Sequence, residues 1–201
     1  MIAWLTRPLF RLLVRLTPDG DPWERIGVAP KLNLFGCGAH LDFPGYLSGP
    51  STVLVHSIVE IQDWLLGCRY ERDEVLFGEA DFWQHPATFE RLRAGDCDDF
   101  ALWTWRKLVE LGIDADIVAG YCLKDGKLGG RHVWVVFRND GVESVFEPTC
   151  SSRQGMIRPL SEARDEYVPE VGADRNGHRF GFTGYMLAQK RRLRRASSSS
   201  A

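Results

Sequence analysis

The feature that most constrains the fold of this 201-residue chain is a change of hydrophobic period at Gly112. Upstream, apolar residues recur at helical spacing from Cys97 to Leu111. Asp96 is a good N-cap for this segment, and Asp99 completes a pattern like a capping box. Downstream the period is 2, which is typical of strands. We therefore predict an α+β fold in which a long helix is followed by an antiparallel meander.

Three predicted strands follow the helix, at residues 115–123, 131–138 and 142–147. Asn139-Asp140-Gly141 is a strong hairpin signal between the last two. A two-residue loop at 139–140 would place His132 directly opposite Glu147, whereas a loop at 140–141 would make them diagonal neighbours. Both registers put the two side chains on one face, and a three-residue loop would separate them.

Upstream of Cys97 the pattern predicts mainly helices. Residues 51–67 have a 3.6-residue period with Ser51 as the cap, and a short helix at 87–93 begins after Pro86. Residues 70–77 are polar and aromatic and are expected to be extended.

Composition indicates an ordinary soluble globular protein, with 44% hydrophobic and 26% charged residues. The formal net charge of −2 gives no global attraction to nucleic acid, and none is expected as a partner. The five cysteines are odd in number and widely spaced, so neither a disulfide framework nor a zinc motif is indicated. A reducing, cytoplasmic location fits best. The alternative is a chain with two disulfides and one free thiol.

The two ends of the chain differ from the middle. Residues 1–50 are predicted to form an amphipathic helix at 1–16 and a loop-rich wrap, 51–185 the main folded domain, and 186–201 a basic, serine-rich disordered tail. The 1–16 segment is too short and too charged to span a bilayer. It would either dock on the domain, which we favour, or lie peripherally on a membrane surface.

Cys97 lies in the first helical turn, where the helix dipole favours a thiolate. The neighbouring aspartates oppose ionisation by like-charge repulsion, so the thiol needs a cationic partner. Alone, Cys97 would be read as a small buried hydrophobe. With His132 and Glu147 paired across the hairpin, however, the chain holds a thiol, an imidazole and a carboxylate, the set that nucleophilic acyl chemistry needs.

Two stretches resemble the bacterial transglutaminase-like cysteine proteinases. WQHPATFERLRAGDCDDFA, from Trp83, is similar to their Trp-x-x-Pro and GDCxDxA patterns, and HVWVVFRNDGVESVFEPT, from His132, to their H-x-W-V-x-V and F-D-P-T patterns. The resemblance covers about residues 52–150. It implies the papain-like, transglutaminase-core fold, with Cys97 as nucleophile, His132 as base and Glu147 as orienting acid. Glu147 departs from the family, which usually has Asp there.

Trp83, Gln84 and Trp134 are assigned to the oxyanion hole and substrate cleft, beside the Cys97 N–H as a donor. No cofactor is expected. Some members of the family depend on calcium, and Asp96, Asp98 and Asp99 are the calcium candidates here, although helix capping explains them without metal. The expected activity is thiol-dependent hydrolysis of amide bonds in a protein or peptide, by a cysteine peptidase or amidase. The alternatives are acyl transfer to an amine and a non-catalytic protein-binding module.

Overall fold

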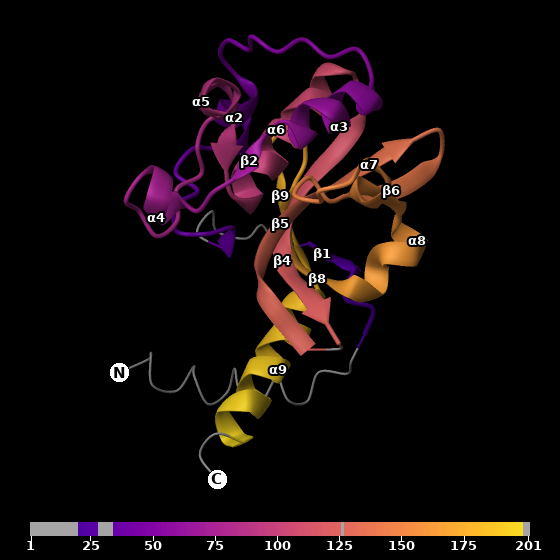
Figure 1. The fold of residues 1–201 in the computed structure, drawn as a ribbon. Helices are drawn as coiled ribbons and strands as arrows, with labels where there is room; N and C mark the ends of the chain where they lie inside the picture. Colours follow the sequence, from indigo (N-terminus) through magenta and orange to yellow (C-terminus); the bar gives the residue numbers. More distant parts are fainter. Residues whose placement is uncertain (1–19, 28–33, 126, 199–201) are drawn as a thin grey trace.

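A computed structural model describes residues 20–27, 34–125 and 127–198 of the chain (Figure 1). The predicted helix at 1–16 and the last three residues lie outside these ranges. Within the described part of the chain, no helix is both long and apolar enough to cross a membrane.

The first half of the chain is mainly helical and gathers in the upper part of Figure 1. Two short strands, β2 and β3, pair in parallel within it. Its elements are β1 (Arg25–Ile26), α2 (Phe43–Leu47), α3 (Ile58–Leu66), β2 (Arg69–Tyr70), α4 (Asp73–Leu76), α5 (Pro86–Leu92), β3 (Ala94–Gly95) and α6 (Cys97–Glu110).

The second half supplies most of an antiparallel sheet, which in the described residues has seven strands in the order β1-β9-β8-β4-β5-β6-β7. Its central strands are long because their Val, Ile, Ala and Phe side chains are buried on both faces. The elements are β4 (Asp114–Lys124), β5 (Lys127–Asn139), β6 (Val142–Phe146), α7 (Arg153–Met156), β7 (Ile157–Pro159), α8 (Leu160–Ala163), η2 (Arg164–Glu166), β8 (Tyr167–Ala173), β9 (Arg179–Phe182) and α9 (Gly184–Ser198).

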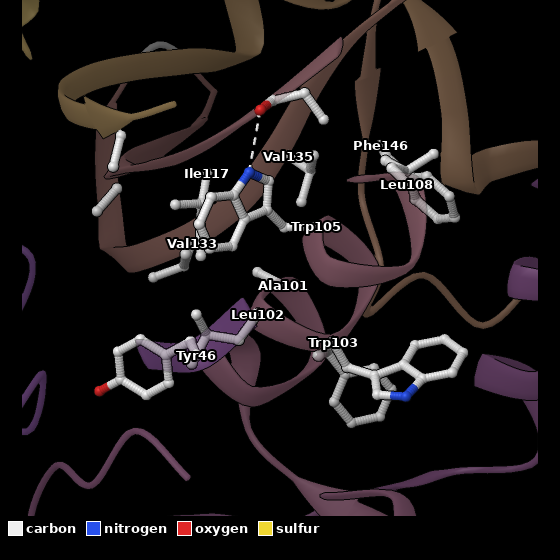
Figure 2. Packing of buried hydrophobic residues seen from close by; sticks show 14 of the residues in the cluster. Tyr46, Ala101, Leu102, Trp103, Trp105, Leu108, Ile117, Val133, Val135 and Phe146 are labelled. Carbon is white, nitrogen blue, oxygen red and sulfur yellow. Dashed lines mark hydrogen bonds between the residues drawn. The ribbon is translucent and has the colours of Figure 1, made fainter. Parts of the chain in front are cut away.

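Helix α6 packs on one face of this sheet, against β4 and β5, as the α+β prediction requires. Figure 2 shows Ala101, Trp105 and Leu108 of the helix meeting Ile117, Val133 and Val135 of the strands. The Trp105 indole N–H donates to the Ala115 carbonyl at 3.0 Å, so even this buried donor is satisfied. The opposite face is covered by a second cluster that includes Trp23, Trp134 and Tyr167.

The predicted Cys97 helix, the strand at 115–123 and the helix at 87–93 after Pro86 are confirmed, the last as α5. The hairpin is confirmed in its second register, because Asn139 pairs with Val142 and the loop is Asp140-Gly141. Both loop residues have positive φ, of 50° and 78°, as a tight two-residue turn requires.

The predicted helix at 51–67 begins too early. Helix α3 starts at Ile58, with Ser57 as its cap, because the Ser57 side chain accepts the Glu60 N–H. Ser51 instead donates to Glu90 at 2.6 Å, a partner far away in the sequence. The extended reading of 70–77 is wrong after Tyr70, since α4 covers most of that segment.

The expectations for the chain ends are also corrected. Helix α9 continues through Ser198, so the predicted disordered tail at 186–201 is wrong as far as that residue. Ala188 of α9 is buried against Tyr121 and Val168, which anchors the first part of the helix. Strand β1 pairs with β9, so Arg25–Ile26 of the predicted wrap belong to the main sheet, while Phe43–Leu47 form helix α2.

Candidate active site

The sequence around Cys97 fixes the thiol in the first turn of α6. The Asp96 side chain accepts the Asp98 N–H, and the Asp99 carboxylate accepts the Asp96 N–H, which confirms the capping box. Three residues earlier the chain passes from α5 into the short strand β3. The thiol is thus held between a capped helix end and the sheet, packed against the core beneath α6.

The surroundings of Cys97 disfavour its thiolate. Burial raises the pKa of the thiol well above its ordinary value, and the charges of Asp98 and Asp96 raise it further. The N–H of Val133 lowers it, but by less than the others raise it. The helix end alone therefore does not activate this thiol, as the sequence predicts, and a base must take its proton.

A candidate for that base, His132, lies on β5. The last pair of the β5–β6 ladder joins Val135 to Phe146, and the next residue, Glu147, turns away to bond the Met156 carbonyl. Glu147 is thereby the diagonal neighbour of His132, and its Oε2 lies 2.7 Å from the His132 Nε2. The predicted histidine–carboxylate pair is present.

Both oxygens of Glu147 are engaged. Oε2 also accepts the Tyr167 hydroxyl at 3.1 Å, while Oε1 accepts the N–H and the hydroxyl of Thr149. Burial would raise the pKa of Glu147, but the bond and charge of His132 and the two Thr149 bonds outweigh it and lower the pKa. Facing an ionised carboxylate, Nε2 of His132 carries the ring proton, and Nδ1 is the basic nitrogen.

The Cys97 thiol lies near the part of β5 where β6 leaves it. Beyond Val135 the edge of β5 is no longer paired with β6, and there the N–H of Val133 faces the Cys97 sulfur. Val133 directly follows His132 in the chain. Burial raises the pKa of Asp96, and the charge of His132 opposes that rise, so His132 lies within electrostatic range of the residue before Cys97. Glu147 is likewise close enough to raise the pKa of the Cys97 thiol.

Beneath the thiol lies a cluster of five aspartates, which we call the acidic cluster: Asp73, Asp81, Asp96, Asp98 and Asp99. Carboxylate oxygens of three of its members, Asp73, Asp81 and Asp98, lie within 4.8 Å of one another. Burial and the neighbouring acids raise the pKa of Asp73 to about 6, and those of Asp98 and Asp99 well above normal. One buried oxygen each of Asp73 and Asp98 has no hydrogen-bond partner among the described residues.

The acidic cluster therefore fits a hard cation, because it offers several carboxylate oxygens and leaves two of them unsatisfied. The calcium candidates named from the sequence are three of its members. Asp73 and Asp81 are missed, because they come from α4 and the loop after it, and no local spacing links them to Cys97.

The three residues assigned to the oxyanion hole and cleft are all buried, and the assignment stays a prediction. Trp83 is 1% exposed and packs against Phe35. Both the backbone N–H and the side-chain amide of Gln84 donate to Asp99. The Trp134 ring is stacked against the His132 ring, with the two ring centroids 6.2 Å apart.

Two further residues near the site are not identified from the sequence. Tyr70 is 54% exposed, packs on Phe100 and lies within electrostatic range of the Cys97 sulfur. It is thus an accessible aromatic side chain beside the thiol. Cys122 of β4 lies close to His132 and Glu147 on the other side. Neither carries a local motif, since both positions depend on tertiary packing.

Comparisons with known proteins give structural likeness alone. No protein-family model matches the sequence, and no curated protein matches it. Legionella pneumophila LapG is similar, with 20% identity and a TM-score of 0.47 over 62% of this chain and 66% of that chain, just under two thirds of its length. Its calcium-bound structure matches at 17% identity and a TM-score of 0.47, over 88% and 87% of the two chains.

A candidate cysteine protease from Cytophaga hutchinsonii is also similar, at 18% identity and a TM-score of 0.38, over 62% of this chain and 51% of that one. At these values the likeness does not assign a function. The case for function therefore rests on the geometry of the site.

Proposed function

We propose that this protein is a cysteine hydrolase of the transglutaminase-like type that cleaves an amide bond through an acyl-enzyme. The observation that carries the proposal is the His132–Glu147 pair, fully hydrogen-bonded and placed at the open edge of β5 beside the Cys97 thiol. In this proposal Cys97 is the nucleophile, His132 the base and Glu147 the residue that orients and stabilises the imidazolium.

The chemistry uses each of these positions. His132 takes the Cys97 proton at Nδ1, and the thiolate attacks the amide carbonyl carbon to form a C–S bond. The backbone N–H of Cys97, in the first turn of α6, donates to the oxyanion. The imidazolium returns its proton to the leaving amine as the C–N bond breaks. Water, deprotonated by His132, then attacks the thioester and releases the acid and the thiol.

The substrate is a protein or peptide in this proposal. Tyr70 supports it, because an exposed aromatic ring beside the thiol offers a flat apolar surface to a bound chain. Hydrolysis is favoured over acyl transfer, since it needs water alone as the second substrate. The alternative of a non-catalytic binding module is disfavoured, because the imidazole and carboxylate are held in a hydrogen-bonded pair that simple binding does not require.

A hard divalent cation would be held by the acidic cluster, with Asp73, Asp81 and Asp98 as its ligands. Once bound, it would supply positive charge that offsets the repulsion which Asp96 and Asp98 exert on the Cys97 thiolate. In the metal-free protein the charges of Asp98 and Asp96 add to burial in holding the pKa of the Cys97 thiol high.

The proposal is tested by trapping the acyl-enzyme and reading its mass, with Cys97→Ala, His132→Gln and the control Cys68→Ser. Cys68 is a thiol on a different element, after α3. We expect Cys97→Ala to lose acylation fully and His132→Gln to lose at least 100-fold in rate, since general-base catalysis contributes about 10²–10⁴-fold. Cys68→Ser should behave as the unaltered protein.

Two outcomes would change the assignment. Acylation that survives in Cys97→Ala but is lost in Cys122→Ser would move the nucleophile to β4. Incorporation of a fluorescent primary amine into casein, faster than hydrolysis, would favour acyl transfer instead.

A further inference from the structure

Cys122 is a thiol that the proposed reaction does not use, although it lies beside the proposed base. Its position follows from the pairing of β4 with β5. Gly120 pairs directly with His132, and the register is regular through Tyr121 and Arg131. Side chains alternate along a strand, so Cys122, two residues after Gly120, lies on the same face of the sheet as His132. Diagonal neighbours on one face are within reach of each other, which brings the Cys122 sulfur to the His132–Glu147 pair.

Three different ligand types converge as a result. A ligand atom from each of Cys122, His132 and Glu147 lies within 4.8 Å of the other two. The His132 and Glu147 side chains are 15% and 16% exposed, so an ion from solvent can reach them. Sulfur, nitrogen and carboxylate oxygen together suit zinc, which binds them at about 2.0–2.3 Å in a tetrahedron, whereas calcium and magnesium prefer oxygen alone.

We propose that Cys122, His132 and Glu147 form a zinc-binding site, separate from the acidic cluster, which inhibits the protein by occupying its base. Binding forms Zn–S, Zn–Nε2 and Zn–O bonds, the His132 ring proton moves from Nε2 to Nδ1, and the Cys122 thiol proton is released to solvent. The sulfur moves inward by about 1 Å, while Nε2 and Oε2, now 2.7 Å apart, separate slightly to reach tetrahedral positions. The fourth position is open to water.

The inhibitory consequence rests on the proposed function, and the binding does not. A His132 ring held by zinc cannot rotate or accept the Cys97 proton, and a Glu147 oxygen bound to the ion no longer orients the ring. Zinc would therefore block thiolate formation without touching Cys97. Cys122 sets this sensitivity, because it is the one member of the site that the reaction leaves idle.

The test uses the full chain, stripped of metal, and cobalt(II) as a coloured substitute for zinc. A thiolate bound to cobalt gives a charge-transfer absorption band, which reports the sulfur directly. We expect the band in the unaltered protein, in Cys97→Ser and in the matched control Cys68→Ser. We expect it to disappear in Cys122→Ser and in Cys122→Ala, two variants that guard against misfolding of either one, with circular dichroism confirming the fold. Zinc added to the cobalt form should displace the band.

The second arm measures how much zinc halves the rate of Cys97 alkylation by iodoacetamide. Each rate is normalised to the metal-free rate of the same variant. Cys122→Ser should need at least 10-fold more zinc than the unaltered protein to halve its rate, whereas Cys68→Ser should need as much zinc as the unaltered protein. A missing band in the unaltered protein, or a band that Cys97→Ser abolishes and Cys122→Ser keeps, overturns the zinc site and leaves the hydrolase proposal standing. If the cobalt band depends on Cys122 but the metal-free protein forms no acyl-enzyme, the zinc site stands and the hydrolase proposal is overturned.

Discussion

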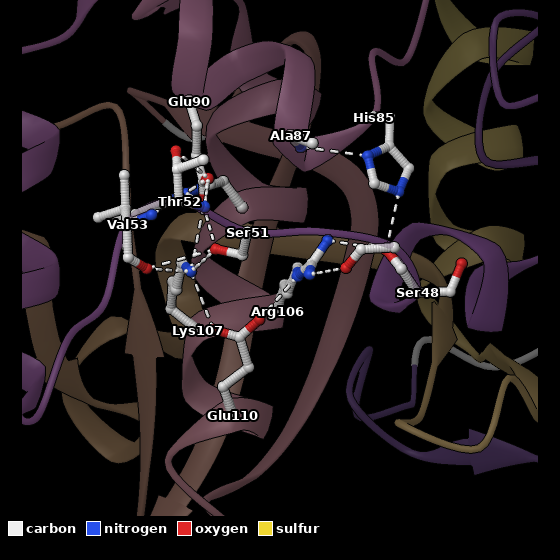
Figure 3. Close-up of polar contacts among 12 residues, drawn as sticks. Ser48, Ser51, Thr52, Val53, His85, Ala87, Glu90, Arg106, Lys107 and Glu110 are labelled. Atoms are coloured by element: carbon white, nitrogen blue, oxygen red, sulfur yellow. Dashed lines mark hydrogen bonds and ion pairs between the residues drawn. The ribbon is translucent and has the colours of Figure 1, made fainter.

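Helix α6 has a buried group of charges near each end, and the two groups are built in opposite ways. Near its C-terminus, Lys107 is fully buried but lies 3.1 Å from Glu90 and 2.9 Å from Glu110, and also donates to Ser51 (Figure 3). At its N-terminus, Asp98 and Asp99 are buried among other aspartates, whose charges repel their own.

The difference appears in the acid–base behaviour of the two groups. Burial alone would raise the pKa of Glu90, but bonds from Ser51, Thr52, Lys107 and Trp103 lower it to about 2. In the acidic cluster burial raises the pKa values, and the neighbouring carboxylates raise them further. The first group is a completed network that pins residues 51–53 to α5 and α6. The second is a set of buried carboxyl groups that repel one another.

The largest effect is expected from Lys107→Met. The methionine leaves Glu90 ionised and buried without its partner, which typically costs about 3–5 kcal/mol in the free energy of unfolding. Urea denaturation measures the loss. The double variant with Glu90→Gln should recover most of it, because no unpaired charge then remains and the amide oxygen still accepts from the donors around it. A single variant within about 1 kcal/mol of the unaltered protein would contradict the view that this network is tightly coupled.

This comparison also explains what the sequence could and could not predict. The capping box at Asp96, the hairpin at 139–141 and the His132–Glu147 pair all follow from neighbours within a few residues or one hairpin. These predictions are confirmed, whereas the choice between the two hairpin registers comes from the structure.

The features that the sequence did not predict share one physical cause, which is long-range contact. Ser51 has the sequence of a helix cap, but its hydroxyl donates to Glu90 and accepts from Lys107. Trp83 packs in the core and Gln84 bonds to Asp99, which motif spacing alone does not indicate. Cys122 is brought to His132 by the pairing of β4 with β5, which spacing within one strand does not reveal.

The two charge groups should give the metal-free protein opposite pH responses. The folded pKa of Asp73 is raised from 3.8 to about 6, so its contribution to stability is complete below pH 4 and is lost as the pH rises through 6. This rise corresponds to about 3 kcal/mol at most. The folded pKa of Glu90 is lowered from 4.5 to about 2, so its contribution is present above pH 4.5 and is lost as the pH falls to 2.

Urea midpoints between pH 2 and pH 8, in a chelator, test this prediction. Stability should be greatest near pH 4–5. Asp73→Asn should flatten the alkaline side of the profile, and Glu90→Gln the acid side. If stability instead rises steadily up to pH 8, ionisation of the acidic cluster does not destabilise the folded protein, and the prediction is wrong.

Calcium should act on one group and leave the other unchanged. An ion that binds the folded protein alone adds about 2.7 kcal/mol of stability when its concentration is 100 times its dissociation constant. We expect thermal unfolding at pH 7.5 to shift upward with calcium in the unaltered protein and equally in Glu110→Gln, which alters the other end of α6. Asp73→Asn should lose most of the shift. An equal shift in Asp73→Asn would place the ion elsewhere.

The smallest and most diagnostic change is Asp98→Asn in the metal-free protein. Asp98 has a buried oxygen without a partner among the described residues, and its charge is the largest electrostatic cause of the raised Cys97 pKa after burial itself. Replacing it with a neutral isostere relieves repulsion among the aspartates, so we expect stability at pH 7.5 to rise by about 1 kcal/mol. The same change should lower the pKa of Cys97, moving the pH profile of its alkylation toward lower pH by about one unit.

Glu110→Gln is the matched control for Asp98→Asn, because it removes one carboxylate from the same helix without approaching the thiol. A destabilised Asp98→Asn protein with an unmoved alkylation profile would mean that Asp98 is already protonated at this pH. Bound protons would then remove the repulsion among the carboxylates of the metal-free acidic cluster. The acidic cluster would differ from the Glu90–Lys107 network only in being protonated.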